Sequence, residues 1–162
     1  MIKLASATAL VSLAAITFAS SVRAQVSPEA QVRQAVQAFY TAFNSHGFDR
    51  AADFTTDDWN HINPFGGRAN GRVAVLKEVL EVHNTFLKGV TDTVTQMDVR
   101  MASSDVAVTT VASDLSRFTT PDGVKHERDH QIRTFIVVKR GGRWLIMQDH
   151  NTFVVAQPGS SR

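Results

Sequence analysis

The sequence predicts an α+β fold in which helices come first and an antiparallel sheet follows. Apolar residues recur at helical spacing as far as residue 88, and from Thr91 the pattern changes to the alternation of apolar and polar residues that is typical of strands. Farther along, two runs rich in strand-forming residues flank Gly141-Gly142, which indicates a hairpin. We therefore expect three N-terminal helices packed on a strongly curved sheet of four antiparallel strands.

The first 24 residues differ in composition from the rest. Lys3 is followed by an uncharged run over residues 4–21, rich in Ala, Ser, Leu and Val, and the segment closes with Val22-Arg23-Ala24. This order predicts a secretory signal peptide, residues 1–24, and one domain over residues 25–162 that is periplasmic or secreted. Ser and Thr interrupt the run too often for a good membrane span, so we expect no membrane association after cleavage; an uncleaved anchor is the alternative.

The charge balance argues against nucleic acid and anionic membranes as partners. The chain has 17 Lys and Arg residues against 15 Asp and Glu residues. Removal of the signal peptide takes away Lys3 and Arg23 and no acidic residue, so the remaining domain is formally neutral and has no electrostatic footprint for such partners. The chain has no cysteine, so the core must hold the fold without disulfides, which a domain of this size can do.

Three helices are expected before the sheet. Ser27-Pro28-Glu29 combines an N-cap, a first-turn proline and an acidic residue near the positive end of the helix dipole, and residues 44–47 end this helix. Its apolar stripe consists of Val32, Val36, Phe39, Tyr40 and Phe43. A short helix is predicted over residues 48–54 and, after an irregular stretch at 55–71, a third, amphipathic helix. The apolar side of the third helix consists of Val73, Leu76, Val79, Leu80, His83 and Phe86.

The irregular stretch carries two aromatic and two polar residues at alternating positions. They are Trp59, His61, Asn63 and Phe65. In an extended segment all four would turn to the same side, so we interpret them as the rim of a pocket, with two polar groups between aromatic walls. The alternative is that Trp59 and Phe65 cap the core. In that case His61 and Asn63 would form hydrogen bonds with the loop backbone.

Residues 126–130 read HERDH, which is the H-E-x-x-H pattern of zinc proteases. Two histidines four positions apart can share a zinc ion on a helix. The alternating pattern and the hairpin that follows place them on a strand, where His126 and His130 would lie about 13 Å apart and Glu127 would point to the other face. We therefore expect a polar strand end and no metal. The glycines of residues 66–71 fit neither a phosphate loop nor a dinucleotide motif, so no cofactor is expected.

The last strand turns from apolar to polar along its length. By alternation, one face holds Leu145, Met147, Asp149 and Asn151, and the other holds Trp144, Ile146, Gln148 and His150. The polar end therefore predicts that this strand leaves the core at Asp149, His150 and Asn151. If that end meets a pocket, Asp149 or His150 could transfer protons, but the alternation does not decide which face points inward.

Two helical residues are further candidates for ligand contact. His83 lies with Phe86 on the inner side of the third helix, and Tyr40 lies beside Phe39 on the first. Each has a simpler interpretation, because a histidine with satisfied hydrogen bonds and a packed phenol ring are both common in protein cores.

Two segments carry a family resemblance. DWNHINPFGG at residues 58–67 and GGRWLIMQDHNT at residues 141–152 resemble the SnoaL-like and DUF4440 branch of the NTF2-like superfamily, most closely its SgcJ/EcaC group. The resemblance spans residues 27–152. It implies the NTF2-like cone, a deep pocket between the helices and the concave side of the sheet, and a homodimer. It also implies that Tyr40 could donate a hydrogen bond to a substrate oxygen, as such a tyrosine does in some relatives.

The resemblance leaves the function open, because the superfamily includes isomerases, dehydratases, epoxide hydrolases, cyclases, binding proteins and oligomerisation modules. The first hypothesis is a pocket enzyme that performs proton-transfer chemistry of the isomerase, dehydratase or cyclase type on a small apolar metabolite. Its candidate acids and bases are His61, Asp149 and His150. The second is a non-catalytic binder that uses the same pocket. The ligand contacts expected in either case are Tyr40, Trp59, Asn63, Phe65, His83, Phe86 and Asn151.

The third hypothesis is a dimerisation module whose cavity has no ligand. An apolar cavity with two titratable groups within reach of one ligand atom would favour the enzyme. A single polar anchor would favour the binder, and a cavity filled by Phe and Met side chains would favour the dimerisation module. The partners expected are therefore a small-molecule ligand or substrate and a second copy of the chain.

Overall fold

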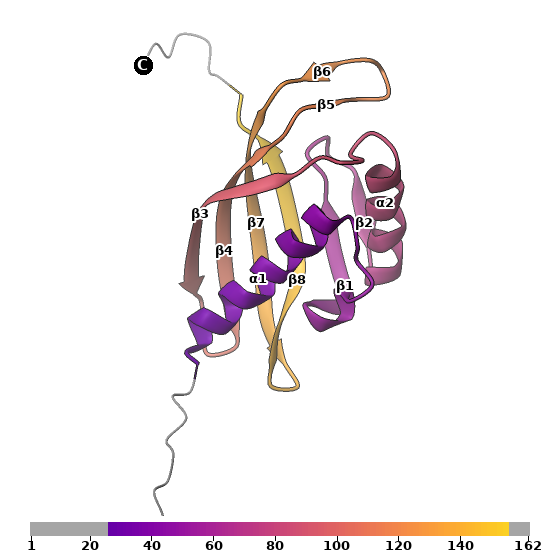
Figure 1. Ribbon diagram of the computed structural model, residues 1–162. Coiled ribbons are helices and arrows are strands. Elements are labelled where there is room, and N and C mark those ends of the chain that lie inside the picture. Colours follow the sequence, from indigo (N-terminus) through magenta and orange to yellow (C-terminus); the bar gives the residue numbers. More distant parts are fainter. Residues whose placement is uncertain (1–25, 156–162) are drawn as a thin grey trace, which may run out of the picture.

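The computed structural model describes residues 26–155 and consists of two helices packed on a six-stranded sheet (Figure 1). The strand order is β2-β1-β8-β7-β4-β3. The strands are β1 (Thr55–Ile62), β2 (Arg68–Asn70), β3 (Asp92–Met101), β4 (Val106–Leu115), β7 (Asp129–Arg140) and β8 (Arg143–Phe153). A separate small hairpin consists of β5 (Phe118–Thr119) and β6 (Lys125–His126). The predicted α+β class is confirmed.

The first helix, α1 (Pro28–Ser45), forms as its sequence predicts. The Ser27 side chain accepts a hydrogen bond from the backbone N–H of Ala30, and the predicted apolar stripe is buried. The helix crosses the sheet and contacts β3 and β8 (Figure 1). Inside, the Phe39 ring meets the rings of Trp59 and Phe135 edge to face at 6.3 and 5.3 Å between centroids. Burial of these rings fixes α1 over the middle of the sheet.

The prediction of three helices is wrong. Residues 48–54 form only a 3₁₀ turn, η1 (Ala51–Asp53), because the stretch is too short to bury an α-helical stripe. The next helix is α2 (Arg72–Asn84), and it packs against β1 and β2. Its buried side consists of Val75, Val79 and His83. Val73 and Leu80 were predicted to face inward, but their side chains are exposed.

The prediction of a purely antiparallel sheet is also wrong, because residues 55–71 contain two strands. β1 pairs antiparallel with β2 and parallel with β8, which makes the sheet mixed. The burial along β1 lacks the regular alternation that marks a strand, since Asp57 and Asp58 are both exposed. Its parallel partner, β8, also lies more than 80 residues away, so no turn sequence between the two strands indicates that they pair.

The predicted hairpin between β7 and β8 is confirmed. Arg140 pairs with Arg143 across Gly141 and Gly142, whose φ angles of 56° and 78° are those of a two-residue primed turn. The register shifts farther along, because Val137 pairs with Ile146 and Ile136 pairs with Gln148. Met147 is the extra residue of this bulge. The bulge places Asp149 on the same side of the sheet as Ile146, so the strict alternation predicted for the last strand is wrong.

Two predictions of the sequence analysis lie beyond what the structure tests. The expected signal peptide, residues 1–24, lies outside the described residues, and the homodimer stays a prediction. Within residues 26–155, no helix is long and apolar enough to cross a membrane.

The hairpin turn gives a stability prediction. Gly142→Ala forces an L-residue into the left-handed region and should lower the free energy of unfolding by about 1–2 kcal/mol, although an added Cβ meets no atom within 4 Å. Gly47→Ala is the matched control, because Gly47 has no positive φ and its added Cβ makes only ordinary contacts at 3.6 Å. Urea unfolding measures both variants. An equal effect of the two substitutions would contradict the backbone explanation.

Candidate functional site

The site is built around one fully buried carboxylate, Asp149. Trp59 Nε1 donates to Asp149 Oδ1 at 2.8 Å, and Asp149 Oδ2 lies 2.8 Å from His61 Nδ1 and 2.9 Å from Arg133 Nη1. The parallel register of β1 and β8 sets His61 directly beside Asp149, and β7 brings Arg133 from the other side. Three donors on three side chains therefore converge on one anion.

Asp149 is ionised in spite of its burial. Burial acts to raise its pKa, but His61, Arg133 and the Trp59 N–H together outweigh this effect and hold the pKa of Asp149 below its ordinary value. An ionised carboxylate can only accept hydrogen bonds, so His61 must donate its Nδ1 proton to Asp149. In neutral His61 the other ring nitrogen, Nε2, then carries a free lone pair.

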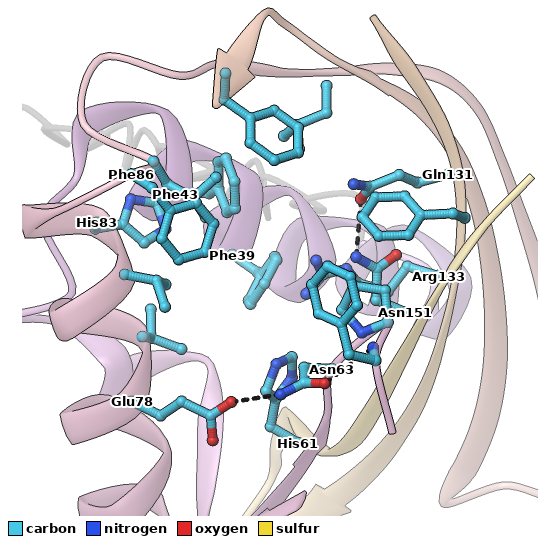
Figure 2. A pocket seen from close by; sticks show the side chains of 18 residues that line it. Phe39, Phe43, His61, Asn63, Glu78, His83, Phe86, Gln131, Arg133 and Asn151 are labelled. Carbon is cyan, nitrogen blue, oxygen red and sulfur yellow. Dashed lines mark hydrogen bonds between the residues drawn. The ribbon is translucent and has the colours of Figure 1, made fainter. Parts of the chain in front are cut away.

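A cavity of about 110 Å³ opens next to this network, between α2 and the sheet (Figure 2). Its walls are mainly aromatic and aliphatic, and the aromatic rings that line it are Phe39, Phe43, Phe65, Phe86, Phe118 and Phe153. This volume is below the 150 Å³ of a cavity that is known to hold benzene, so the space suits a very small apolar ligand or the end of a larger one. The polar side chains among the walls are His61, Asn63, Glu78, His83, Gln131, Arg133 and Asn151.

The sheet side of the cavity holds two polar groups that the protein leaves partly unused. The Arg133 guanidinium lies 4.8 Å from the centre of the Phe39 ring, and its Nε has no hydrogen-bond partner among the described residues. Asn151 Nδ2 donates to Gln131 Oε1 at 2.9 Å, while Asn151 Oδ1 is buried and has no partner there either. Figure 2 shows Gln131, Arg133 and Asn151 together on one wall. Buried polar atoms normally have a hydrogen-bond partner, and the described residues supply none for these two atoms.

Asn63 shapes the rim of the cavity. Its side-chain oxygen accepts hydrogen bonds from the backbone N–H groups of Phe65 and Gly67 at 3.0 and 2.9 Å, and its Nδ2 donates to Glu78 Oε1 at 2.9 Å (Figure 2). The alternative interpretation from the sequence, in which Asn63 binds loop backbone, therefore describes its hydrogen bonds, although Asn63 also lines the cavity. Phe65 lies at the rim, is 69% exposed and meets Phe153 edge to face.

The structure brings six of the ten predicted site residues to the cavity. They are His61, Asn63, Phe65, His83, Phe86 and Asn151. Asp149 and Trp59 lie behind the wall, where they orient His61. Tyr40 does not line the cavity; burial raises its pKa to about 12, so its hydroxyl stays protonated.

His150 was one candidate acid or base, but the structure does not place it at the cavity. The β8 bulge turns Asp149 and Asn151 inward and His150 outward, where its side chain is exposed. Sequence reasoning also missed Arg133 and Gln131. A faint signal existed, since Gln131, Arg133 and Phe135 alternate along one strand, so Arg133 shares a face with an aromatic residue. The structure buries all three.

The two histidines of HERDH bind different carboxylates. His126 Nδ1 lies 2.6 Å from Asp129 Oδ2, and His130 Nδ1 lies 2.5 Å from Asp114 Oδ1. The segment is not helical, as predicted, but the prediction of one strand is wrong, because His126 ends β6 and His130 lies in β7. Residues 26–155 contain no group of three or more side chains that could hold a metal ion. The His126 ring instead stacks on Phe118 at 4.3 Å, beside the cavity.

Comparisons with known proteins place the chain in a family. The SnoaL-like domain model matches residues 32–156. A structure from Caulobacter vibrioides with a cystatin-like fold is 26% identical, with 77% of this chain and 88% of that chain covered and a TM-score of 0.74. No curated protein matches the sequence significantly.

Two further structures resemble this one at lower identity. A ketosteroid isomerase-like protein from Erwinia carotovora atroseptica is 22% identical, with 79% of this chain and 97% of that chain covered and a TM-score of 0.66. A protein of the NTF2-like family from Streptomyces avermitilis, described as a candidate dehydratase, is 18% identical, with 79% and 96% covered and a TM-score of 0.65. These likenesses do not select the DUF4440 branch or the SgcJ/EcaC group. The chain belongs to the SnoaL-like domain family, and its fold is that of the NTF2-like superfamily.

Proposed function

We propose that this protein is an enzyme that removes a proton from a carbon atom of a small, largely apolar ligand, with His61 as the general base. The observation that carries the proposal is the hydrogen bond between His61 and the ionised Asp149. It leaves His61 Nε2 as a proton acceptor in an apolar cavity. Proton abstraction from carbon is the first step of many isomerisations and dehydrations, which were among the reactions expected from the sequence.

Arg133 completes the arrangement. When His61 takes a proton from a carbon next to a carbonyl group, the electron pair of the broken C–H bond moves onto the carbonyl oxygen. Arg133 lines the same cavity and can donate N–H groups to that oxygen, which stabilises the negative charge as it develops. Because Arg133 is already fixed by Asp149 and the Phe39 ring, little reorganisation is needed.

The cavity also supports this proposal over the two alternatives. Its space is open, whereas a dimerisation module with no ligand would be expected to fill it with side chains. Its lining includes the charged or titratable groups His61, Arg133, Glu78 and His83, whereas a simple binder needs only one polar anchor. The neighbours described as isomerase-like or dehydratase show the fold alone, so the proposal rests on the geometry of His61.

A probe reaction tests the base without knowledge of the natural ligand. In nitrobenzisoxazole, a base removes the ring C–H proton, the electron pair forms a nitrile, and the N–O bond breaks to release a coloured phenolate. We expect the folded wild-type protein to turn the probe over. The rate should fall about a hundredfold in His61→Gln, because general base catalysis typically contributes at least that much. The matched control is His150→Gln, which changes an exposed histidine and should leave the rate unchanged.

Turnover that is the same in wild type and His61→Gln would contradict the proposal. Binding of the probe without any turnover would favour the non-catalytic binder.

The variant Asp149→Asn tests whether the carboxylate that orients His61 is ionised, through the pH dependence of protein stability. Because the pKa of Asp149 is lowered in the folded protein, its ionised form stabilises the fold above about pH 4, and this stabilisation is lost as the pH falls through the folded-state pKa. The variant leaves Arg133 without its anion and should unfold about 3 kcal/mol more easily at neutral pH. The difference from wild type should shrink below pH 4.

Urea unfolding between pH 7 and pH 3 measures this difference. Asp58→Asn is the control, since Asp58 forms an exposed pair with Arg140 that is worth about 1 kcal/mol or less. If wild type and Asp149→Asn differ in free energy of unfolding by the same amount at every pH, Asp149 is not ionised in the folded protein.

A further inference from the structure

A second histidine reaches the same cavity from the helix side. His83 lies on α2, whereas His61 and Arg133 come from the sheet (Figure 2). The His83 side chain is 2% exposed and lines the cavity. Its Nδ1 lies 2.7 Å from His46 Nδ1, and its Nε2 is buried with no hydrogen-bond partner among the described residues. One ring nitrogen is therefore fixed by the protein and the other is unused.

His46 connects this pair to the protein surface. It is the C-cap residue of α1, with a left-handed φ of 53°, and its backbone N–H donates to the carbonyl oxygen of Phe43 at 3.0 Å. The His46 side chain is half-buried, whereas that of His83 is buried. A proton can therefore pass from water to His46 and from His46 to His83 without crossing the core.

The surroundings of His83 keep its ring neutral. Phe43 and Phe48 pack against it at 4.5 and 5.3 Å between ring centroids, and the groups that act on its charge are His46 and Arg133, with no carboxylate among them. Burial, and to a smaller extent these two groups, lowers the pKa of His83 to about 4. Only one of the two facing Nδ1 atoms can carry the proton of this 2.7 Å contact; when it is His46, a neutral His83 carries its own proton on Nε2.

We propose that His83 is a general acid of this cavity and that His46 restores its proton from solvent. The proposal rests on the proposed function, in which His61 is the base. In the step itself, His83 gives its Nε2 proton to the ligand and takes the Nδ1 proton of His46, while His46 takes a proton from water on its own Nε2. One proton enters from solvent and one reaches the ligand, so neither ring becomes an imidazolate.

An acid and a base on opposite walls narrow the substrate class to β-hydroxy carbonyl compounds. His61 would remove the proton next to the carbonyl group, and Arg133 would stabilise the oxygen of the resulting enolate. The electron pair would then form the carbon–carbon double bond as the C–O bond breaks, and the departing hydroxyl would take the His83 proton and leave as water. Arg133 serves the carbonyl oxygen, so the leaving oxygen needs a separate donor, which His83 provides.

The test compares two leaving groups in the probe reaction. The phenolate released from nitrobenzisoxazole is a weak base and leaves unaided, whereas the phenolate released from unsubstituted benzisoxazole is more basic and gains more from an acid. We expect His83→Phe and His46→Gly to slow benzisoxazole turnover at least about tenfold more than nitrobenzisoxazole turnover. His61→Gln should slow both probes equally. Glycine suits the positive φ at position 46, so His46→Gly should fold even if His83→Phe does not.

The outcomes separate the two proposals. If the ratio of the two rates stays at its wild-type value in His46→Gly and in any folded His83→Phe protein, His83 is a core histidine and the acid role is wrong, while the role of His61 stands. If neither probe shows turnover that depends on His61, the proposed function fails and the acid role fails with it. Thermal unfolding of each variant confirms that the proteins compared are folded.

Discussion

The buried carboxylate of Asp149 is the interaction on which the rest of the site depends. A charge in the interior is costly unless it is paired and hydrogen-bonded, and Asp149 meets this requirement with Trp59, His61 and Arg133. These donors lie on β1 and β7, the two neighbours of β8 in the sheet. The same hydrogen bonds therefore link three strands, fix the tautomer of His61 and hold Arg133 at the cavity.

This arrangement keeps the Asp149 anion out of the cavity. The anion lies behind the wall, so the cavity itself can stay apolar while it receives a proton acceptor from His61 and N–H donors from Arg133. Hydrogen bonds in such a low-dielectric space are stronger than in water, and groups that are already oriented need no reorganisation when a ligand changes its charge. His46 and His83 form a similar arrangement on the helix side. There His46 binds Nδ1 of His83, and Nε2 of His83 is left for a ligand.

Much of the fold could be predicted from local signals in the sequence. The N-cap at Ser27, the apolar stripe of α1 and the Gly141-Gly142 turn each act within a few residues, and each forms as expected. The parallel pairing of β1 with β8 could not be predicted, because it depends on contacts between distant segments. The bulge at Met147 has no local signal either, so the sequence could not show that Asp149 faces inward and His150 outward.

The candidate site was predictable only in part for the same reason. His61 stood out as a polar residue between aromatic ones, and Asp149 as the polar end of a strand, but their contact exists only through the parallel register. Arg133 and His46 belong to no catalytic motif, and His46 was noted only within the segment that ends the first helix.

The most direct test of the account is the protonation state of the His61 ring, measured by long-range ¹H–¹⁵N NMR of the folded protein at neutral pH. We predict a proton on Nδ1 and a free lone pair on Nε2. A ring with its proton on Nε2 would contradict the account, because Asp149 would then not accept from His61 and the cavity would have no base.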